Sequence, residues 1–185
     1  CFMGPSLADD IRDFQIEGIS IGDSLLDYLS KEKIINIEKT NYPRSKKFYS
    51  ISILANSILA TSNIYDQFTF AIKQDDKKYI IYALSGDIRF KDGLKGCLKQ
   101  KKEIVEEISS QFTNTKKENY TFKYKKLADG KSISEVTNLN FQDASSIRIY
   151  CNSFTKQAEK KGYKDMLSVS VSTSEIMYWL ENEAY

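Results

Sequence analysis

The chain contains no histidine, and this absence removes several functional classes at once. Histidine is the commonest general base, the partner of nucleophilic serine and cysteine in hydrolases, and a common zinc ligand. Three cysteines among 185 residues are too few for a four-cysteine zinc or iron–sulfur site. We therefore expect neither a metal centre nor a cofactor. A hydrolase with this sequence would have to use carboxylates, lysine or tyrosine.

The sequence also lacks an apolar run near the roughly 18 residues that a transmembrane helix requires. Its 27 basic and 25 acidic side chains leave a formal charge of +2, which gives no reason to expect a general binder of nucleic acids or membrane surfaces. Hydrophobic residues make up 41% of the chain and aromatic residues 12%, enough for a packed interior. At this length we expect one domain, or two small ones that share a core.

The N-terminal residues have the pattern found at the end of a secretory signal peptide. An apolar start and a Gly-Pro break are followed by small residues at Ser6 and Ala8, directly before an acidic stretch. Signal peptidase cleaves after such a small-x-small pattern. We therefore expect residues 1–8 to be a signal-peptide remnant, the mature chain to begin at Asp9, and the protein to be periplasmic or secreted.

Export changes the interpretation of the cysteines. Acylation of Cys1, as in a lipoprotein, is less favoured than cleavage because two apolar residues follow it where a polar tether is usual. Cleavage leaves Cys97 and Cys151, an even pair in an oxidising compartment. Both lie on apolar faces, Cys97 of a predicted helix and Cys151 of a predicted strand, so packing of the helix on the sheet would bring them together. We expect a disulfide between them; two buried free thiols are the alternative.

Apolar spacing predicts a chain of mixed helices and strands. The clearest helix is predicted over 92–112, where apolar residues recur at three- and four-residue steps. Shorter helices are expected over 20–29, with Ser20 as N-cap and Asp23 in capping-box position, and over 32–38, with Ser30 as a cap. A last short helix is expected after Thr173. Alternation of apolar and polar residues predicts strands at 49–53, 68–72, 79–90, 120–124, 137–141, 147–151 and 167–171.

These elements predict an α+β fold, a mainly antiparallel sheet covered by one long and several short helices. Hairpin-length connections between the strands are the reason for expecting antiparallel pairing. Residues 9–185 are expected to form a single domain. The order of helix and then strands occurs in both 9–91 and 92–185, which suggests two tandem units with three or four strands each.

The stretch Gly18-Ile19-Ser20, which opens a short helix ahead of three strands, carries a resemblance to known families. It resembles the outer-membrane assembly lipoproteins of the SmpA/OmlA type and the β-lactamase inhibitor proteins, whose domains are helix-on-sheet units in tandem. This resemblance covers the first half of the chain and implies an envelope binding module. The whole chain, rich in Lys, Ile, Asn and Tyr, resembles small uncharacterised exported proteins of marine alphaproteobacteria, which implies no activity.

Acidic residues cluster without the spacing of a known catalytic or metal site. A calcium loop needs alternating oxygen donors around a glycine, and paired catalytic acids need a shared cleft. Neither is visible in the sequence. The clusters are Asp9, Asp10 and Asp13, then Asp75 and Asp76, and then Glu103, Glu106 and Glu107.

Lysines surround a strand that carries three aromatic residues. Basic and aromatic residues together are typical of platforms that stack single-stranded nucleic acid. Alternation, however, places the aromatic residues on one strand face and the lysines on the other. We interpret the aromatic residues as core and the lysines as solvated, so nucleic-acid binding is not expected. The residues are Tyr120, Phe122 and Tyr124, with Lys116, Lys117, Lys123, Lys125, Lys126 and Lys131.

The sequence therefore predicts an exported, non-enzymatic protein that binds another protein or a component of the envelope. Two alternatives stay open: an enzyme whose carboxylates or lysines converge in the fold, and a binder of single-stranded nucleic acid. A cleft with two titratable groups of shifted pKa would favour the enzyme. An exposed apolar sheet face would favour binding.

Overall fold

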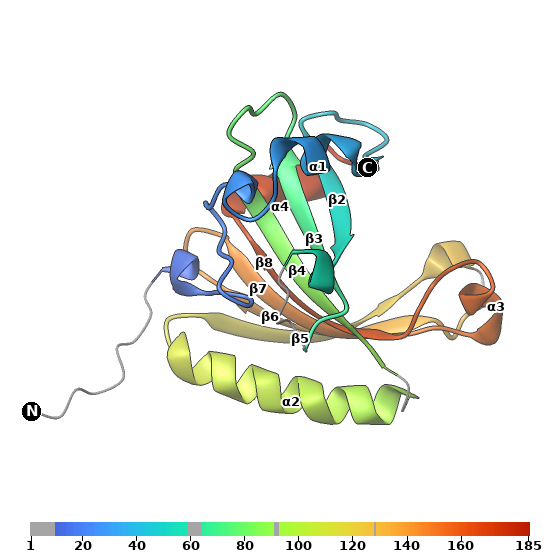
Figure 1. The fold of residues 1–185 in the computed structure, drawn as a ribbon. Helices are drawn as coiled ribbons and strands as arrows, with labels where there is room; N and C mark the ends of the chain where they lie inside the picture. The colour runs from blue at the N-terminus through green and yellow to red at the C-terminus, as the bar shows by residue number, and fades with distance from the viewer. Residues whose placement is uncertain (1–9, 59–63, 91–92, 128) are drawn as a thin grey trace, which may run out of the picture.

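The chain folds around one eight-stranded antiparallel sheet, which confirms the predicted α+β class (Figure 1). The computed structural model describes residues 10–58, 64–90, 93–127 and 129–185, so the expected cleavage before Asp9 lies outside the described residues. The strand order is β1-β2-β3-β4-β8-β7-β6-β5. The strands are β1 (Lys39–Asn41), β2 (Phe48–Leu54), β3 (Gln67–Lys73), β4 (Ile81–Arg89), β5 (Lys116–Lys123), β6 (Ile133–Asn140), β7 (Ser146–Ser153) and β8 (Met166–Ser172).

The described helices begin close to where the sequence places them. They are α1 (Lys31–Asn36), α2 (Gly93–Gln111), α3 (Lys156–Glu159) and α4 (Ser174–Asn182). The hydroxyl of Ser30 accepts the backbone N–H of Lys33 at 3.3 Å, and that of Thr173 accepts the N–H of Ile176 at 3.4 Å. The predicted cap at Ser30 is therefore confirmed, and Thr173, which the sequence places directly before the last helix, caps that helix. The predicted cap at Ser20 was wrong, because no helix follows it and Ser24 instead caps a 3-10 turn over Leu25–Asp27. Short 3-10 turns add η1 (Ile11–Asp13), η2 (Leu25–Asp27), η3 (Ala55–Ser57) and η4 (Lys125–Leu127).

The helix predicted over 20–29 was wrong except for η2. Backbone N–H groups of this segment form hydrogen bonds with residues 79–81 instead of with the preceding turn of a helix. Gly22 donates to the Ile81 carbonyl at 2.8 Å, and Leu25 donates to the Tyr79 carbonyl at 2.9 Å. The backbone groups that a helix would use are thus occupied by the segment at the start of β4, which the apolar spacing of 20–29 cannot reveal.

One face of the sheet carries the main core. On β8, for example, Leu167, Val169 and Val171 are at most 2% exposed and point to this face. α2 lies along it and contacts β7 above all, with β6 and β8 beside it (Figure 1). The N-terminal segment covers the rest, and its Phe14 packs edge to face on Phe112 with ring centroids 6.0 Å apart. On the opposite face, α4 packs over one end of the sheet, where its Ile176 and Trp179 form a second core cluster with Phe48 and Ala71.

The two halves of the chain share this sheet. β4 from the first half pairs with β8 from the second over seven residues, from Ala83 opposite Ser172 to Arg89 opposite Met166. The tandem order of elements in 9–91 and 92–185 is therefore joined into one continuous layer. β1 was not predicted, because three exposed polar residues at a sheet edge carry no alternation signal.

Candidate ligand-binding groove

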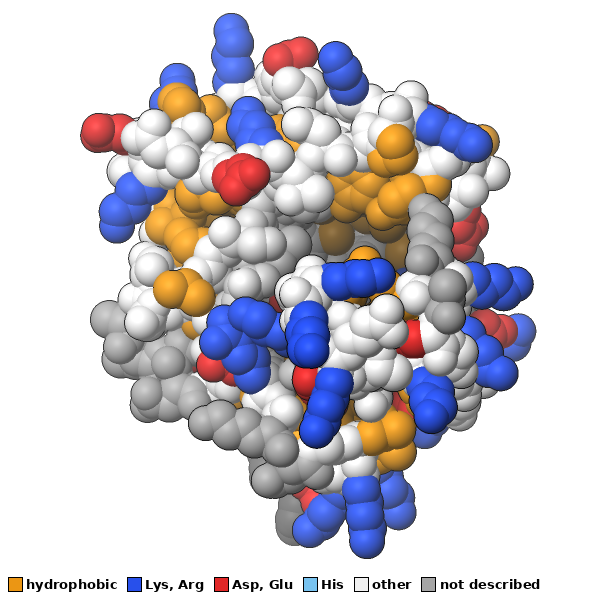
Figure 2. Space-filling view, turned by 90° about the vertical axis from the view of Figure 1, so that its right-hand side faces the viewer, with side chains coloured by type: hydrophobic (Ala, Val, Ile, Leu, Met, Phe, Trp, Pro, Cys, Tyr) orange, Lys and Arg blue, Asp and Glu red, His pale blue; other side chains and the backbone are white. Residues whose placement is uncertain are grey.

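The face of the sheet opposite α2 forms a groove of about 420 Å³. The sheet bends strongly, so that β2 to β4 rise from the level at which β5 to β7 lie (Figure 1). Figure 2 looks from the open side and shows a hollow near its middle, with Lys and Arg side chains gathered below it. α4 lines one end of the groove through Ile176, Met177 and Leu180. The curvature of the sheet, with a helix at one end, thus produces a concave surface open to solvent.

The groove floor is made of small hydroxyl side chains because the strands alternate. On β8 the residues between the core positions are serines, and β4 and β7 contribute serines in the same way. Serine is short, so it leaves space above the sheet where a longer side chain would fill it. The hydroxyl residues of the lining are Ser50, Thr69, Ser85, Ser134, Ser146, Ser170 and Ser172.

Three of these hydroxyls face the groove without a protein partner. Within the described part of the chain, the side-chain oxygens of Ser85, Ser146 and Ser172 form no hydrogen bond. Others are occupied: Ser50 bonds the Tyr42 hydroxyl at 2.9 Å. The free hydroxyls can each donate and accept, so they are available to a ligand or to water.

Arg148 is the one charged side chain among the described residues that line the groove. It lies on β7 between Ser170 of β8 and Asn138 of β6. Its Nε donates to the Asn138 side-chain oxygen at 2.9 Å, which fixes the orientation of the guanidinium plane. Within the described residues no carboxylate forms an ion pair with it. A partly buried positive charge therefore faces the groove with hydrogen-bonding capacity left over.

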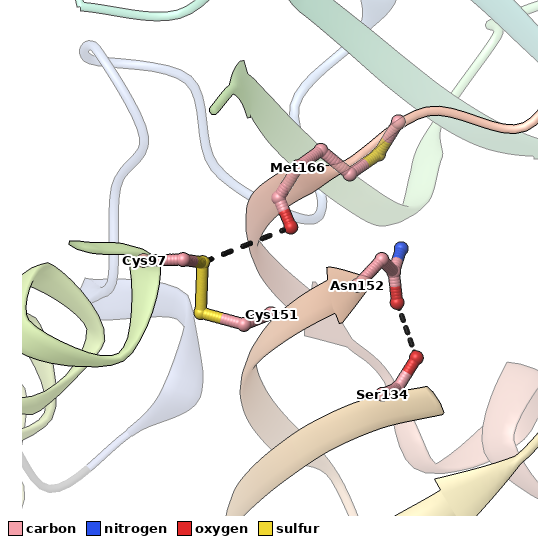
Figure 3. The surroundings of a disulfide bond; sticks show 5 residues. All are labelled: Cys97, Ser134, Cys151, Asn152 and Met166. Atoms are coloured by element: carbon pink, nitrogen blue, oxygen red, sulfur yellow. Dashed lines mark hydrogen bonds between the residues drawn. A yellow bond between two sulfur atoms is a disulfide. The ribbon is translucent and has the colours of Figure 1, made fainter. Parts of the chain in front are cut away.

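Aromatic side chains form one wall. Tyr120 on β5 is 41% exposed and Phe122 is 51% exposed, and both line the groove. Phe122 contacts Tyr124 edge to face, with ring centroids 5.1 Å apart. The Tyr124 hydroxyl bonds Ser134 at 2.8 Å and Asn152 at 3.1 Å. Ser134 also donates to Asn152, as Figure 3 shows. The wall is therefore anchored at Tyr124 and open at Tyr120.

The interpretation of these aromatic residues as core was wrong for Tyr120 and Phe122, which are exposed, whereas Tyr124 is half-buried. All eight residues of β5 are exposed, since it is an edge strand and its Tyr120 and Phe122 lie on the sheet face opposite α2. Alternation was correct in placing Tyr120 and Phe122 on one face and Lys117 and Lys123 on the other. It could not tell that neither face of this strand is covered. The aromatic side chains therefore belong to the groove.

Asp87 and Tyr150 are two titratable groups next to the groove with shifted pKa values. Asp87 is 8% exposed, and burial raises its pKa against the opposing effect of the Ser168 hydroxyl, which donates to it at 2.6 Å. Burial, with a smaller contribution from Asp87, raises the pKa of Tyr150 to about 12. Tyr150 lines the groove but Asp87 does not. The carboxyl is thus withdrawn from the ligand, and the phenol stays protonated as a hydrogen-bond donor.

Replacing Asp87 with asparagine is expected to stabilise the protein in a pH-dependent way. The raised pKa means that the folded state binds the proton more tightly than the unfolded chain. This contribution to stability is full below the unfolded pKa of about 3.9 and is lost as pH rises through the folded value. Urea unfolding across this range should show Asp87→Asn equal to the parent in acid and more stable near neutrality. An equal gain at every pH would contradict this, because it would reflect packing and not ionisation.

The described members of the acidic clusters singled out in the sequence do not line the groove, and Asp9 lies outside the described residues. Asp10 pairs with its neighbour Arg12, Asp76 accepts the backbone N–H groups of Lys78 and Ile80 in a turn, and Glu106 pairs with Lys102 on α2. In the described ranges, no group of three or more His, Cys, Asp or Glu side chains could hold a metal ion. These clusters therefore stabilise local structure and the solvated face of α2.

The predicted cysteine pair is joined in the structure. Cys97 on α2 and Cys151 on β7 form a disulfide with Cα atoms 6.0 Å apart, on the face of the sheet away from the groove (Figure 3). Cys97 is 1% exposed and Cys151 is fully buried. The Cys97 Sγ lies 3.9 Å from the Met166 carbonyl oxygen of β8. The bond ties the covering helix to the centre of the sheet.

Sequence reasoning missed Arg148 and the serine floor. A signal was present, since serine alternates with aliphatic residues in β8 and an arginine interrupts the apolar alternation of β7. Neither strand shows by itself that its polar face meets those of β4 and β6. The groove exists only once the strand order is known.

Comparison with protein families, with the sequences of curated proteins and with solved structures gave no match to this chain. No relative therefore indicates a ligand for the groove. The resemblance of the first half to SmpA/OmlA-type and β-lactamase-inhibitor-type modules stays a prediction. The chemistry of the site is the remaining guide to function.

Proposed function

We propose that the protein is an exported binding protein that acts without catalysis and holds a component of the cell envelope in the concave groove. One observation supports this above all: the lining combines hydroxyl groups, aromatic rings and one guanidinium, with no carboxylate among its described residues. Such groups hold a ligand through hydrogen bonds and ring contacts. They supply no general base or nucleophile pair, which an enzyme without histidine would need.

Two further observations, the disulfide and the small residues before Asp9, support export. A disulfide between Cys97 and Cys151 is of the kind that persists in oxidising compartments. In the described part of the chain, no helix is long and apolar enough to cross a membrane. The small residues before Asp9 fit removal of a signal peptide. A periplasmic or secreted binding protein is consistent with both of these observations.

The test is a titration of the isotope-labelled protein, disulfide intact, with fractions of envelope extract, followed by amide chemical shifts. We expect at least one fraction to shift amides of β5, β7 and β8 around the groove and to leave the solvated side of α2 unchanged. Ser170→Phe, which fills the floor, should abolish these shifts. Ser110→Phe on the exposed side of α2 is the matched control and should preserve them. Shifts confined to other surfaces, or conversion of the extract by the protein, would contradict the proposal.

A further inference from the structure

We propose that the ligand of this groove is an acidic saccharide whose carboxylate pairs with Arg148 and whose sugar ring lies against Tyr120. This inference rests on the proposed binding function and names the chemical class of the ligand. It is carried by three independent properties of the groove: its charge, its unpaired hydroxyls and its exposed aromatic wall.

The charge of the groove requires an anion. Arg148 is held by Asn138 through Nε at 2.9 Å, and its remaining N–H groups face a lining without a carboxylate among the described residues. A guanidinium presents paired donors that match the two oxygens of a carboxylate. The lysine and arginine side chains below the hollow in Figure 2 add an attractive field for the same charge. A neutral or cationic ligand would leave Arg148 desolvated without a partner.

The body of the ligand must be polar. The hydroxyls of Ser85, Ser146 and Ser172 have no protein partner in the described ranges, and all three line the floor. An acyl chain on this floor would bury them unsatisfied, at about 1–3 kcal/mol for each group. Sugar hydroxyls donate and accept as serine hydroxyls do, so they satisfy the floor. This argues against a lipid tail and for a polyhydroxylated ligand.

The aromatic wall gives the third constraint. Tyr120 is 41% exposed, although an edge strand does not require a large solvent-exposed aromatic ring for its stability. The face of an aromatic ring is electron-rich and attracts the polarised C–H groups on the face of a sugar ring. The groove volume of about 420 Å³ falls within the ~300–1,000 Å³ typical of small-ligand sites. A short segment of an acidic saccharide therefore fits in size as well as in chemistry.

An acidic peptide is the competing ligand, and the structure favours it less. A peptide in extended form binds most readily by adding to an open sheet edge, where backbone groups are unpaired. The two edges of the sheet are β1 and β5, and both lie outside the groove floor. Arg148 and the free hydroxyls lie on the floor and not along either edge. A peptide bound at either edge would leave them unused.

Calorimetric titration of the disulfide-intact protein with uronic acid oligosaccharides tests the inference. The probes are oligomers of galacturonic, glucuronic and mannuronic acid, the matching neutral oligosaccharides, and a glutamate-rich peptide. We expect at least one uronate oligomer to bind, and its neutral counterpart to bind at least about tenfold more weakly. Arg148→Gln should weaken uronate binding by about ten- to a hundredfold, as loss of a charge-assisted hydrogen bond does. Arg89→Gln, an exposed arginine outside the lining, is the matched control and should have no effect.

Tyr120→Ala separates the ring contact from the charge. It should weaken the binding of acidic oligosaccharides and of any neutral oligosaccharide that binds measurably by similar factors. Arg148→Gln should weaken the binding of the acidic ones only. Unchanged melting temperatures of both variants show that the fold is kept. If none of the uronates binds, or if the glutamate-rich peptide shifts the groove amides at lower concentration, the saccharide assignment is overturned. Amide shifts in the groove on addition of envelope extract would then still support the proposed binding function. If the extract caused no such shifts either, both the saccharide assignment and the binding function would be overturned.

Discussion

Replacing Cys97 and Cys151 together with alanine is expected to lower the free energy of unfolding by about 4 kcal/mol. The bond closes a loop with a sequence separation of 54, and removing it returns that loop entropy to the unfolded chain. Urea unfolding followed by the fluorescence of the single tryptophan measures the change. Adding a reductant should bring the parent to the stability of the double variant and leave the variant itself unchanged.

The state of the same disulfide in the cell also tests the predicted export of the protein. Thiol counting on the unfolded, unreduced protein from its native cell should find Cys97 and Cys151 unreactive. Two reactive thiols at these positions would contradict the disulfide and remove one of the supports for export. Unequal effects of reductant and of the double alanine variant would show that packing, and not the cross-link, dominates.

Replacing Trp179 with alanine is expected to cost about 3–5 kcal/mol and to open one end of the groove. Trp179 lies on the buried face of α4 and is fully buried, with its ring centroid 5.1 Å from that of Phe48 and 4.7 Å from that of Tyr42. Its Nε1 donates to the Ser45 hydroxyl at 2.8 Å, across 134 residues of sequence. The side chain thus holds α4 and the residues before β2 together over the sheet.

Far-UV circular dichroism during urea unfolding measures this loss, because the variant has no tryptophan left to report. Tyr178→Ala is the matched control: the side chain is adjacent and aromatic but 63% exposed, so its loss should change stability little. Trp179→Phe should be intermediate, since it keeps a ring and loses the bond to Ser45. Equal losses in Tyr178→Ala and Trp179→Ala would show that helix propensity, and not the buried cluster, explains the effect.

The enzyme alternative receives partial support from the charges of the site. Asp87 and Tyr150 both have raised pKa values, and two titratable groups with shifted pKa values in a cleft would favour an enzyme. However, Asp87 bonds Ser168 and does not line the groove. A general base must reach the proton that it removes. We therefore interpret Asp87 as a buried residue that supports the groove floor next to Tyr150.

Local sequence pattern was sufficient for much of the secondary structure. The spacing of apolar residues placed α2 within one residue at each end, and alternation placed β7 and β8. Ser30 and Thr173 marked the starts of α1 and α4 because an N-cap is decided by bonds within one turn. The pairing of Cys97 with Cys151 also followed, since two apolar faces that pack together bring their members into contact.

The tertiary structure alone decided which other elements the faces of the predicted helices and strands pack against. Alternation showed that Tyr120 and Phe122 share a face, but their exposure depends on that face being the one opposite α2, which lines the groove. The segment before Leu25 has the spacing of a helix and pairs with the start of β4 instead. Arg148 acquires its surroundings from β6 and β8, neighbours set by a strand order that joins both halves of the chain. Side-chain spacing along a strand is a local property, whereas a groove is formed by strand order, sheet curvature and the limits of the covering layer.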